Sequence, residues 1–181
     1  MDLLIAISQG LGLAVAAGFL AAAPLALGST AARLGFAHSA LSFAGDPITL
    51  AVTWALTIIE VVTDVIWPGA QAGAMLIRRI VGGGLAFELI AGDRVPFVGL
   101  VAGALMAGAV AVVLREVRAR AVKGGGDLRG TAIIEDGAGL VASVVGCIPF
   151  AGYPMATAGL GLFVRVRRRD REKYKGLRVL R

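Results

Sequence analysis

The chain has 181 residues, of which 57% are hydrophobic and 17% charged, and a mean hydropathy of +0.83. Aromatic residues make up only 6%, so that Ala, Val, Leu, Ile and 26 glycines dominate, as in closely packed transmembrane helices. A soluble protein of this length could not bury so much apolar surface, so composition excludes that class and predicts an all-α, polytopic integral membrane protein.

The net charge of +6 is unevenly spread along the chain. Nine of the 18 basic residues lie in residues 165–181, and five more lie between residues 115 and 129. Basic segments beside apolar spans are typical of cytoplasmic anchors that touch anionic lipid head groups, so we expect no nucleic acid as partner. The charge pattern predicts one transmembrane domain, residues 1–164, in the inner (plasma) membrane, with a basic cytoplasmic tail, residues 165–181.

The first apolar stretch, residues 3–32, is longer than the roughly 20 residues that a membrane-spanning helix needs. Pro24 is expected to kink this stretch or to divide it into two shorter helices. Asp2 stands where a secretory signal carries a basic residue, so we expect the stretch to be retained. Residues 35–46 contain no Lys or Arg, as in a short external loop.

The second apolar stretch carries two acidic residues. Asp46 and Pro47 have the form of a helix start, with an N-cap followed by proline, and the helix is predicted to continue to Trp67. Glu60 and Asp64 are four residues apart within it, so both project from one helical face. Two like charges repel there, so either one carboxyl holds a proton or a cation lies between them.

Residues 70–92 fit three structures. Arg78 and Arg79 interrupt the apolar run, three glycines occupy positions 82–84, and Glu88 follows. A broken helix, a re-entrant hairpin and an interfacial amphipathic segment all match this pattern. The two arginines are candidates to contact an anionic lipid or a phosphate, or else they mark a cytoplasmic turn.

Residues 95–114 form the clearest span, because they are apolar and uncharged. Gly99 and Gly103 have the spacing that lets two helices approach closely. The basic residues in 115–123 are expected to be cytoplasmic, and the three glycines at 124–126 are expected to form a flexible joint.

The last apolar stretch, residues 131–164, is too long for one upright span and short for two full ones. If residues 115–130 and the basic tail both lie inside, the stretch must form a hairpin of two helices around residues 149–154. A single tilted span with the tail outside is the alternative. Glu135 and Asp136 lie near the beginning of this stretch.

A short sequence echo divides the chain into possible halves, residues 1–92 and 95–164. Thr57-Ile-Ile-Glu60 resembles Ala132-Ile-Ile-Glu135, and a proline follows each segment. A duplicated, transporter-like fold explains the echo. Chance similarity in a chain rich in Ala, Gly and Ile is the competing explanation.

Three segments together resemble a known family of small bacterial membrane proteins, the domain of unknown function numbered 4126. They are Gly10-Leu-Gly-Leu-Ala-Val-Ala-Ala-Gly-Phe-Leu-Ala-Ala-Ala-Pro-Leu25, the spacing of Glu60, Asp64 and Pro68, and Glu135-Asp136 ahead of a basic end. The resemblance covers nearly the whole chain. It implies a membrane protein and carries no activity with it.

The acidic residues within apolar stretches are the best candidates for a functional site. They are Glu60, Asp64, Glu135 and Asp136. An ionised side chain in a bilayer costs at least a few kcal/mol, so such residues usually face a cavity, pair with a base or act in function. We expect a shared site near the midplane for a cation, a proton or a small polar substrate. The structural alternatives are pairing with Arg78 and Arg79, or, for the later two, stabilisation by a helix dipole.

Three classes of function fit these features. A small transporter or channel explains the intramembrane carboxylates and broken helices together. A lipid-handling protein, such as a scramblase or a translocase for a phosphorylated lipid, explains the arginines, and an accessory membrane subunit explains the lack of strong motifs. The sequence contains no H-E-x-x-H and no G-x-S-x-G, so we expect no enzyme, no catalytic residue, no metal and no cofactor. So few short membrane elements could hardly enclose a wide pathway alone, which predicts a homo-oligomer.

Overall fold

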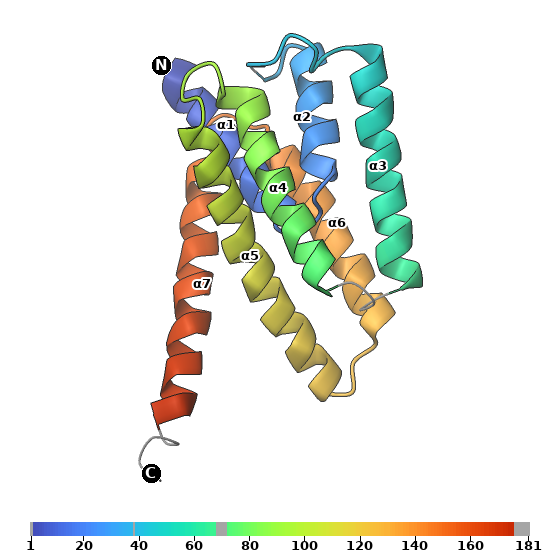
Figure 1. The fold of residues 1–181 in the computed structure, drawn as a ribbon, viewed down its shortest axis with the longest axis vertical. Coiled ribbons are helices and arrows are strands. Elements are labelled where there is room, and N and C mark those ends of the chain that lie inside the picture. Colours follow the sequence, from blue (N-terminus) through green and yellow to red (C-terminus); the bar gives the residue numbers. More distant parts are fainter. Residues whose placement is uncertain (1, 38, 68–71, 176–181) are drawn as a thin grey trace.

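The computed structural model describes residues 2–37, 39–67 and 72–175. Over these residues the chain is all-α, with seven helices and no strand (Figure 1). The helices are α1 (Asp2–Ala17), α2 (Ala23–Arg33), α3 (Pro47–Ile66), α4 (Ala72–Ala91), α5 (Val98–Lys123), α6 (Leu128–Gly146) and α7 (Gly152–Lys175).

The first helix of the chain lies in the middle of the bundle. α1 packs against α2, α4, α5, α6 and α7, and ten of its 16 residues are buried. Its glycines make this central position possible. A Cβ atom on Gly12 would lie 2.7 Å from Cα of Gly146, and one on Gly10 would lie 3.2 Å from Cδ2 of Phe87. Small residues therefore let several helices approach α1 at backbone distance.

α1 and α2 form a hairpin that turns back inside the molecule. The N-terminus and the connection after α2 lie at the same end, and α2 runs beside only part of α3 (Figure 1). At 1.5 Å per residue α1 and α2 are about 24 Å and 16 Å long, both shorter than the roughly 30 Å hydrocarbon core of a bilayer. The predicted division of residues 3–32 is confirmed. The break covers residues 18–22, and Pro24 occupies the first turn of α2, where proline is tolerated.

α3 has the reverse of the surface pattern of a water-soluble protein. Its buried residues are Thr57, Glu60 and Asp64, all of them polar. Large apolar side chains such as Ile48 and Ile58 are exposed instead. Among the described elements α3 packs only against α2 and α6, so most of its circumference is uncovered. The predicted start at Pro47 is confirmed, although the Asp46 side chain forms no capping hydrogen bond.

α4 is one continuous helix, so the broken helix and the hairpin expected within residues 70–92 are wrong. The glycine run lies inside α4 and serves close packing. A Cβ atom on Gly82 would lie 2.7 Å from the carbonyl oxygen of Ala21, and one on Gly83 would lie 2.8 Å from that of Gly103. The predicted close contact at Gly103 is thus present, with α4 as the partner helix.

α5 extends the predicted span of residues 95–114 through the basic residues to Lys123. The joint that follows is a tight turn, in which Gly125 has a φ of +79°, a conformation that glycine adopts without strain. Asp127 then caps α6. Its carboxylate accepts hydrogen bonds from the backbone N–H groups of Gly130 and Arg129, and these bonds hold the pKa of Asp127 below its ordinary value.

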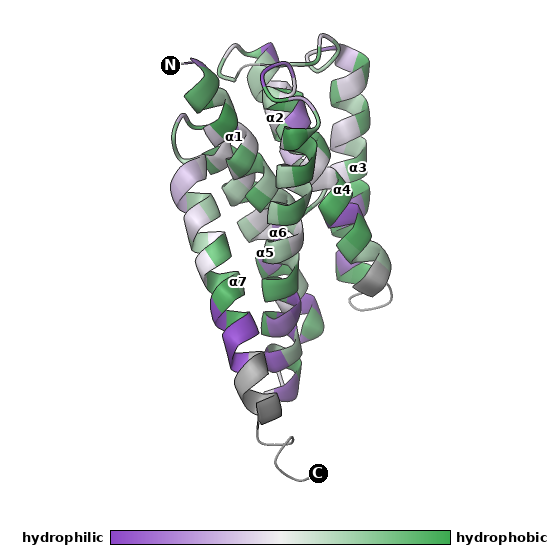
Figure 2. Ribbon diagram, turned by 60° about the vertical axis from the view of Figure 1, so that its left-hand side comes forward, coloured by the Kyte–Doolittle hydropathy of each residue, from purple (hydrophilic) through white to green (hydrophobic). Residues whose placement is uncertain are grey.

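α6 and α7 form the predicted hairpin, with a turn at residues 147–151, so the single tilted span is wrong. The hydrophilic residues gather at one end of the molecule, on the lower parts of α5 and α7 (Figure 2). α7 continues as a helix to Lys175, so the first part of the predicted tail is helical. Residues 176–181 of that tail lie outside the described residues.

Two of the described helices, Pro47–Ile66 and Val98–Lys123, are long and apolar enough to cross a membrane, judged by length and composition.

Candidate functional site

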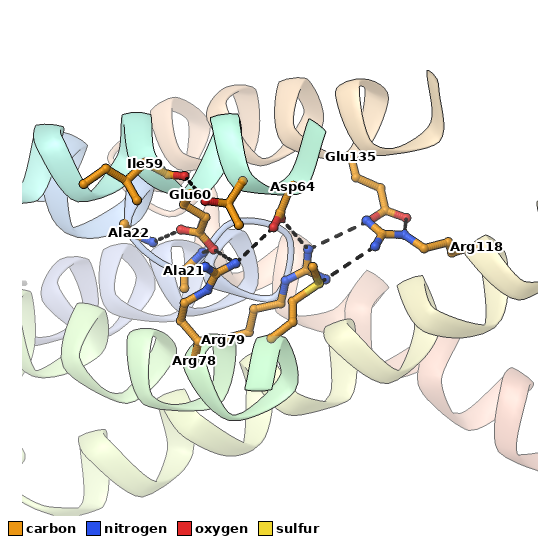
Figure 3. Close-up of polar contacts among 11 residues, drawn as sticks. Ala21, Ala22, Ile59, Glu60, Asp64, Arg78, Arg79, Arg118 and Glu135 are labelled. Atoms are coloured by element: carbon orange, nitrogen blue, oxygen red, sulfur yellow. Dashed lines mark hydrogen bonds and ion pairs between the residues drawn. The ribbon is translucent and has the colours of Figure 1, made fainter. Parts of the chain in front are cut away.

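The structure brings the predicted site residues together, along with one arginine that the sequence did not single out. Figure 3 labels all of these residues except Asp136. α3 supplies two of them, α4 two, α5 one and α6 two. We call this set the charge cluster. Its members are Glu60, Asp64, Arg78, Arg79, Arg118, Glu135 and Asp136.

Glu60 holds the inner end of the α1–α2 hairpin. Its Oε1 accepts a hydrogen bond from the backbone N–H of Ala21 at 2.9 Å, and its Oε2 accepts one from Ala22 at 2.7 Å. Ala22 is the N-cap of α2 and has no side chain that could cap the helix. Buried backbone N–H groups without partners are costly, so the carboxylate of α3 satisfies the N-cap N–H of α2, as the glutamate of a capping box does within its own helix.

Arg78 lies between the two acidic residues of α3. Its Nη2 is 3.0 Å from Oε1 of Glu60 and 3.3 Å from Oδ1 of Asp64. The cation expected between these carboxylates is therefore a guanidinium from the next helix. Arg78 and Arg79 lie well inside α4, which begins at Ala72, so the interpretation that they mark a turn is wrong.

A second group of contacts centres on Glu135. Arg118 of α5 donates two hydrogen bonds to Glu135. Its Nη2 is 2.7 Å from Oε2, and its Nε is 3.4 Å from Oε1. Nη2 of Arg79 is 3.8 Å from Glu135 and 4.0 Å from Asp64, too far for a hydrogen bond. Arg79 is only 4% exposed, yet its Nε and Nη2 have no hydrogen-bond partner.

Sequence reasoning missed Arg118 because it treated the basic residues after position 114 as anchors outside the apolar region. The positions of the two residues in the sequence could have indicated the contact, because residues 118 and 135 are nearly equally far along the chain from the turn at 124–127. Two antiparallel helices joined by a short turn place such residues opposite one another.

Asp136 is the acidic residue of the cluster that has no hydrogen-bond partner. It is 2% exposed, and neither of its carboxyl oxygens has one. It interacts electrostatically with Asp64, Arg79, Glu60 and Glu135. The helix dipole does not explain its position, because α6 begins at Leu128 and the effect is confined to the first turn.

The charges of the cluster balance if Asp136 is left aside. Three guanidinium groups pair with three carboxylates, those of Glu60, Asp64 and Glu135. The structural alternative, pairing of the acidic residues with Arg78 and Arg79, thus describes part of the cluster and leaves Asp136 unexplained. Among the described residues no group of three or more His, Cys, Asp or Glu side chains is arranged to hold a metal ion.

A cavity of about 90 Å³ adjoins the cluster between α4, α5 and α6. We call it the arginine cavity. Its polar walls are Arg79, Arg115, Arg118 and Glu135, and its apolar walls are Met75, Leu76 and Ala111. Arg115 is exposed, whereas Arg79 is buried at the inner side of the cluster. Neither Arg78 nor the acidic residues of α3 line this cavity.

The two glutamates of the sequence echo, Glu60 and Glu135, lie in this one cluster and each pairs with an arginine. Their further contacts differ, because Glu60 also binds the backbone of the hairpin turn. A duplication of the two halves stays a prediction.

Residues 7–169 match the sequence family described as "Domain of unknown function (DUF4126)", which confirms the resemblance seen in the sequence. No curated protein and no solved structure matches the chain.

Proposed function

The chain belongs to the DUF4126 family, and from the charge cluster we propose that it is a small multi-pass membrane transporter or channel whose site takes up a proton at Asp136. The observation that carries this proposal is a buried carboxyl group with two unpartnered oxygens beside a network of ion pairs that is balanced without it.

The membrane part of the proposal is supported by α3. A helix that buries only polar residues and exposes Ile48 and Ile58 suits a hydrocarbon surrounding, since its apolar surface would be unfavourable in water. The basic lower ends of α5 and α7 lie at the same end of the molecule (Figures 1 and 2). By the positive-inside rule this end faces the cytoplasm, with the N-terminus outside and the protein in the inner membrane, where the basic end meets anionic head groups.

The proposal that Asp136 takes up a proton is supported by the free-energy cost of burying an ionised carboxylate. An ionised carboxylate without hydrogen bonds is strongly disfavoured in an apolar surrounding, whereas a protonated one is tolerated. Among its charged neighbours Asp64 opposes the ionisation of Asp136 most strongly, Arg79 favours it, and Glu60 and Glu135 oppose it more weakly. A proton that arrives and leaves here changes the charge of the whole cluster.

The α1–α2 hairpin favours a transport function of the charge cluster over a purely structural one. Its inner turn, residues 18–22, brings non-helical backbone to the cluster, where Glu60 binds it. Broken helices of this kind surround the sites of many transporters, because a helix start presents free N–H groups and can move as a unit. The uncovered face of α3 also suits a second copy of the chain, so we propose a homo-oligomer.

The test is proton uptake by liposomes that contain the purified protein and a pH-sensitive dye, with valinomycin and K⁺ to clamp the membrane potential. We expect the wild-type protein to acidify the interior faster than empty liposomes do. Asp136→Asn should return the rate to that of empty liposomes, because Asn resembles the protonated acid in shape and cannot exchange a proton. Glu116→Gln, on the surface of α5, should keep the wild-type rate.

Equal rates for wild type and Asp136→Asn would contradict the proposal. In that case the second candidate is lipid handling, which the three arginines of the arginine cavity favour. Transfer of fluorescent phospholipid between the leaflets of the same liposomes would support it. Silence in both assays, together with co-purification of a larger membrane protein, would indicate an accessory subunit.

A further inference from the structure

The arginine cavity is electrostatically unbalanced. Three arginines line it, and Glu135 is the one carboxylate among its lining residues. Arg79 also lies within 4.0 Å of Asp64 and Arg118 pairs with Glu135, so Arg115 is the lining arginine that no ion pair with a described residue neutralises. Guanidinium groups from α4 and α5 converge there, and Arg79 is buried with N–H groups that no hydrogen bond satisfies. Buried donors without partners are rare in proteins and mark a place where an acceptor is missing.

The shape of the cavity limits what that acceptor is. With a volume of about 90 Å³, the cavity has room for a compact anion of a few heavy atoms. The apolar residues Met75, Leu76 and Ala111 complete the wall and lower the local dielectric, which strengthens binding to the arginines.

We propose that the arginine cavity binds a phosphate group, either inorganic phosphate or the head of a phosphomonoester lipid. The negative charge of this group complements the three arginines, of which Arg115 has no carboxylate partner among the described residues. The tetrahedral oxygens of the phosphate can accept from Arg79, Arg115 and Arg118 at once, and planar guanidinium groups bind phosphate oxygens in this way. The inference concerns equilibrium binding and does not rest on proton uptake at Asp136.

Glu135 competes with this ligand for the same guanidinium. Its carboxylate holds Arg118 at 2.7 Å, so a phosphate that binds Arg118 must share it or displace Glu135. Neutralising Glu135 should therefore strengthen phosphate binding. If the Glu135–Arg118 ion pair only held the cavity in shape, neutralising Glu135 would weaken phosphate binding instead.

The experiment measures binding of inorganic phosphate by calorimetry to the full chain in phosphatidylcholine nanodiscs. Arg115→Gln should weaken binding about tenfold or more, because a hydrogen bond to a charged group is lost. Arg115 is exposed, so the fold should tolerate this change. Arg120→Gln is the matched control on the same helix, since Arg120 pairs with Glu116 and does not line the cavity. It should bind phosphate as the wild type does, and Glu135→Gln should bind it several-fold more tightly.

A second arm separates the two sources of the phosphate. In nanodiscs that contain phosphatidic acid, a lipid ligand would occupy the cavity and weaken the binding of added phosphate in the wild type. Unchanged phosphate binding would assign the site to the free anion. Two results overturn the proposal. In the first, the wild type binds no inorganic phosphate, and wild type and Arg115→Gln retain equal amounts of phosphatidic acid. In the second, Arg115→Gln and Arg120→Gln weaken phosphate binding equally.

Discussion

Glu60 and Asp136 are both about 2% exposed, yet their carboxyl groups meet different surroundings. Glu60 accepts two backbone hydrogen bonds and contacts Arg78, so its negative charge is compensated on several sides. Asp136 has no hydrogen-bond partner at either oxygen. Burial alone therefore does not separate a structural carboxylate from a candidate proton site, whereas the number of hydrogen-bond partners does.

The structural role of Glu60 is testable by replacement. Glu60→Ala should lower the free energy of unfolding by about 2–5 kcal/mol, because it leaves two backbone N–H groups, those of Ala21 and Ala22, without their acceptor. Unfolding of the purified protein by SDS in mixed micelles, followed by circular dichroism, measures this difference. Glu116→Ala removes an exposed pair on α5 and should change stability by less than about 1 kcal/mol. Similar values for the two variants would show that Glu60 does not hold the hairpin turn.

At the scale of helices, glycine positions decide how closely the elements pack. α4 meets α5 and α1 along its glycine run, and the turn of the α1–α2 hairpin rests against Gly82. This contact brings α4 close to the hairpin, from where the long side chain of Arg78 reaches Glu60 of α3. The charge cluster thus depends on backbone approach elsewhere in the bundle.

A pair of identical substitutions tests this dependence. Gly83→Ala should destabilise the fold by about 1–3 kcal/mol, because the new Cβ would lie 2.8 Å from the carbonyl oxygen of Gly103. Gly137→Ala, in the middle of α6, meets no atom within 4 Å. It should leave stability unchanged or raise it by up to about 1 kcal/mol through helix propensity. The same SDS unfolding assay compares the two, and equal effects would contradict the packing role of Gly83.

At the scale of the whole molecule, the two ends differ in charge. The basic residues of α5 and α7 gather at the end that also holds the turn between α5 and α6 (Figure 2). The N-terminus and the connection between α2 and α3 lie at the other end (Figure 1). The orientation proposed from this asymmetry would place the arginine cavity in the half nearer to the cytoplasm.

Cysteine labelling in cells tests that orientation. In a Cys147→Ala background, Phe36→Cys should react with a membrane-impermeant maleimide in intact cells, because the exposed Phe36 lies in the connection after α2. Lys123→Cys, at the end of α5, should react only after the membrane is permeabilised. Labelling of both residues from the same side would contradict the proposed topology.

Much of the helical framework was predictable because its signals are local. Proline and N-cap positions fixed the start of α3, composition fixed the apolar spans, and the length of residues 131–164 together with the charge at both ends indicated a hairpin. The four acidic residues were recognisable for the same reason, since a charge within an apolar run is visible in the sequence itself.

The partners of those charges were decided by tertiary structure. Glu60 binds the backbone at Ala21, 39 residues away, and Arg118 meets Glu135 across a turn. The glycine run of α4 illustrates the reason. Glycine permits either a break or a close helix contact, and the choice depends on whether a neighbouring backbone lies within reach. The sequence alone determined which residues are apolar, charged or small, whereas the approach of α1, α4 and α5 decided which charges are paired and left Asp136 without a hydrogen-bond partner.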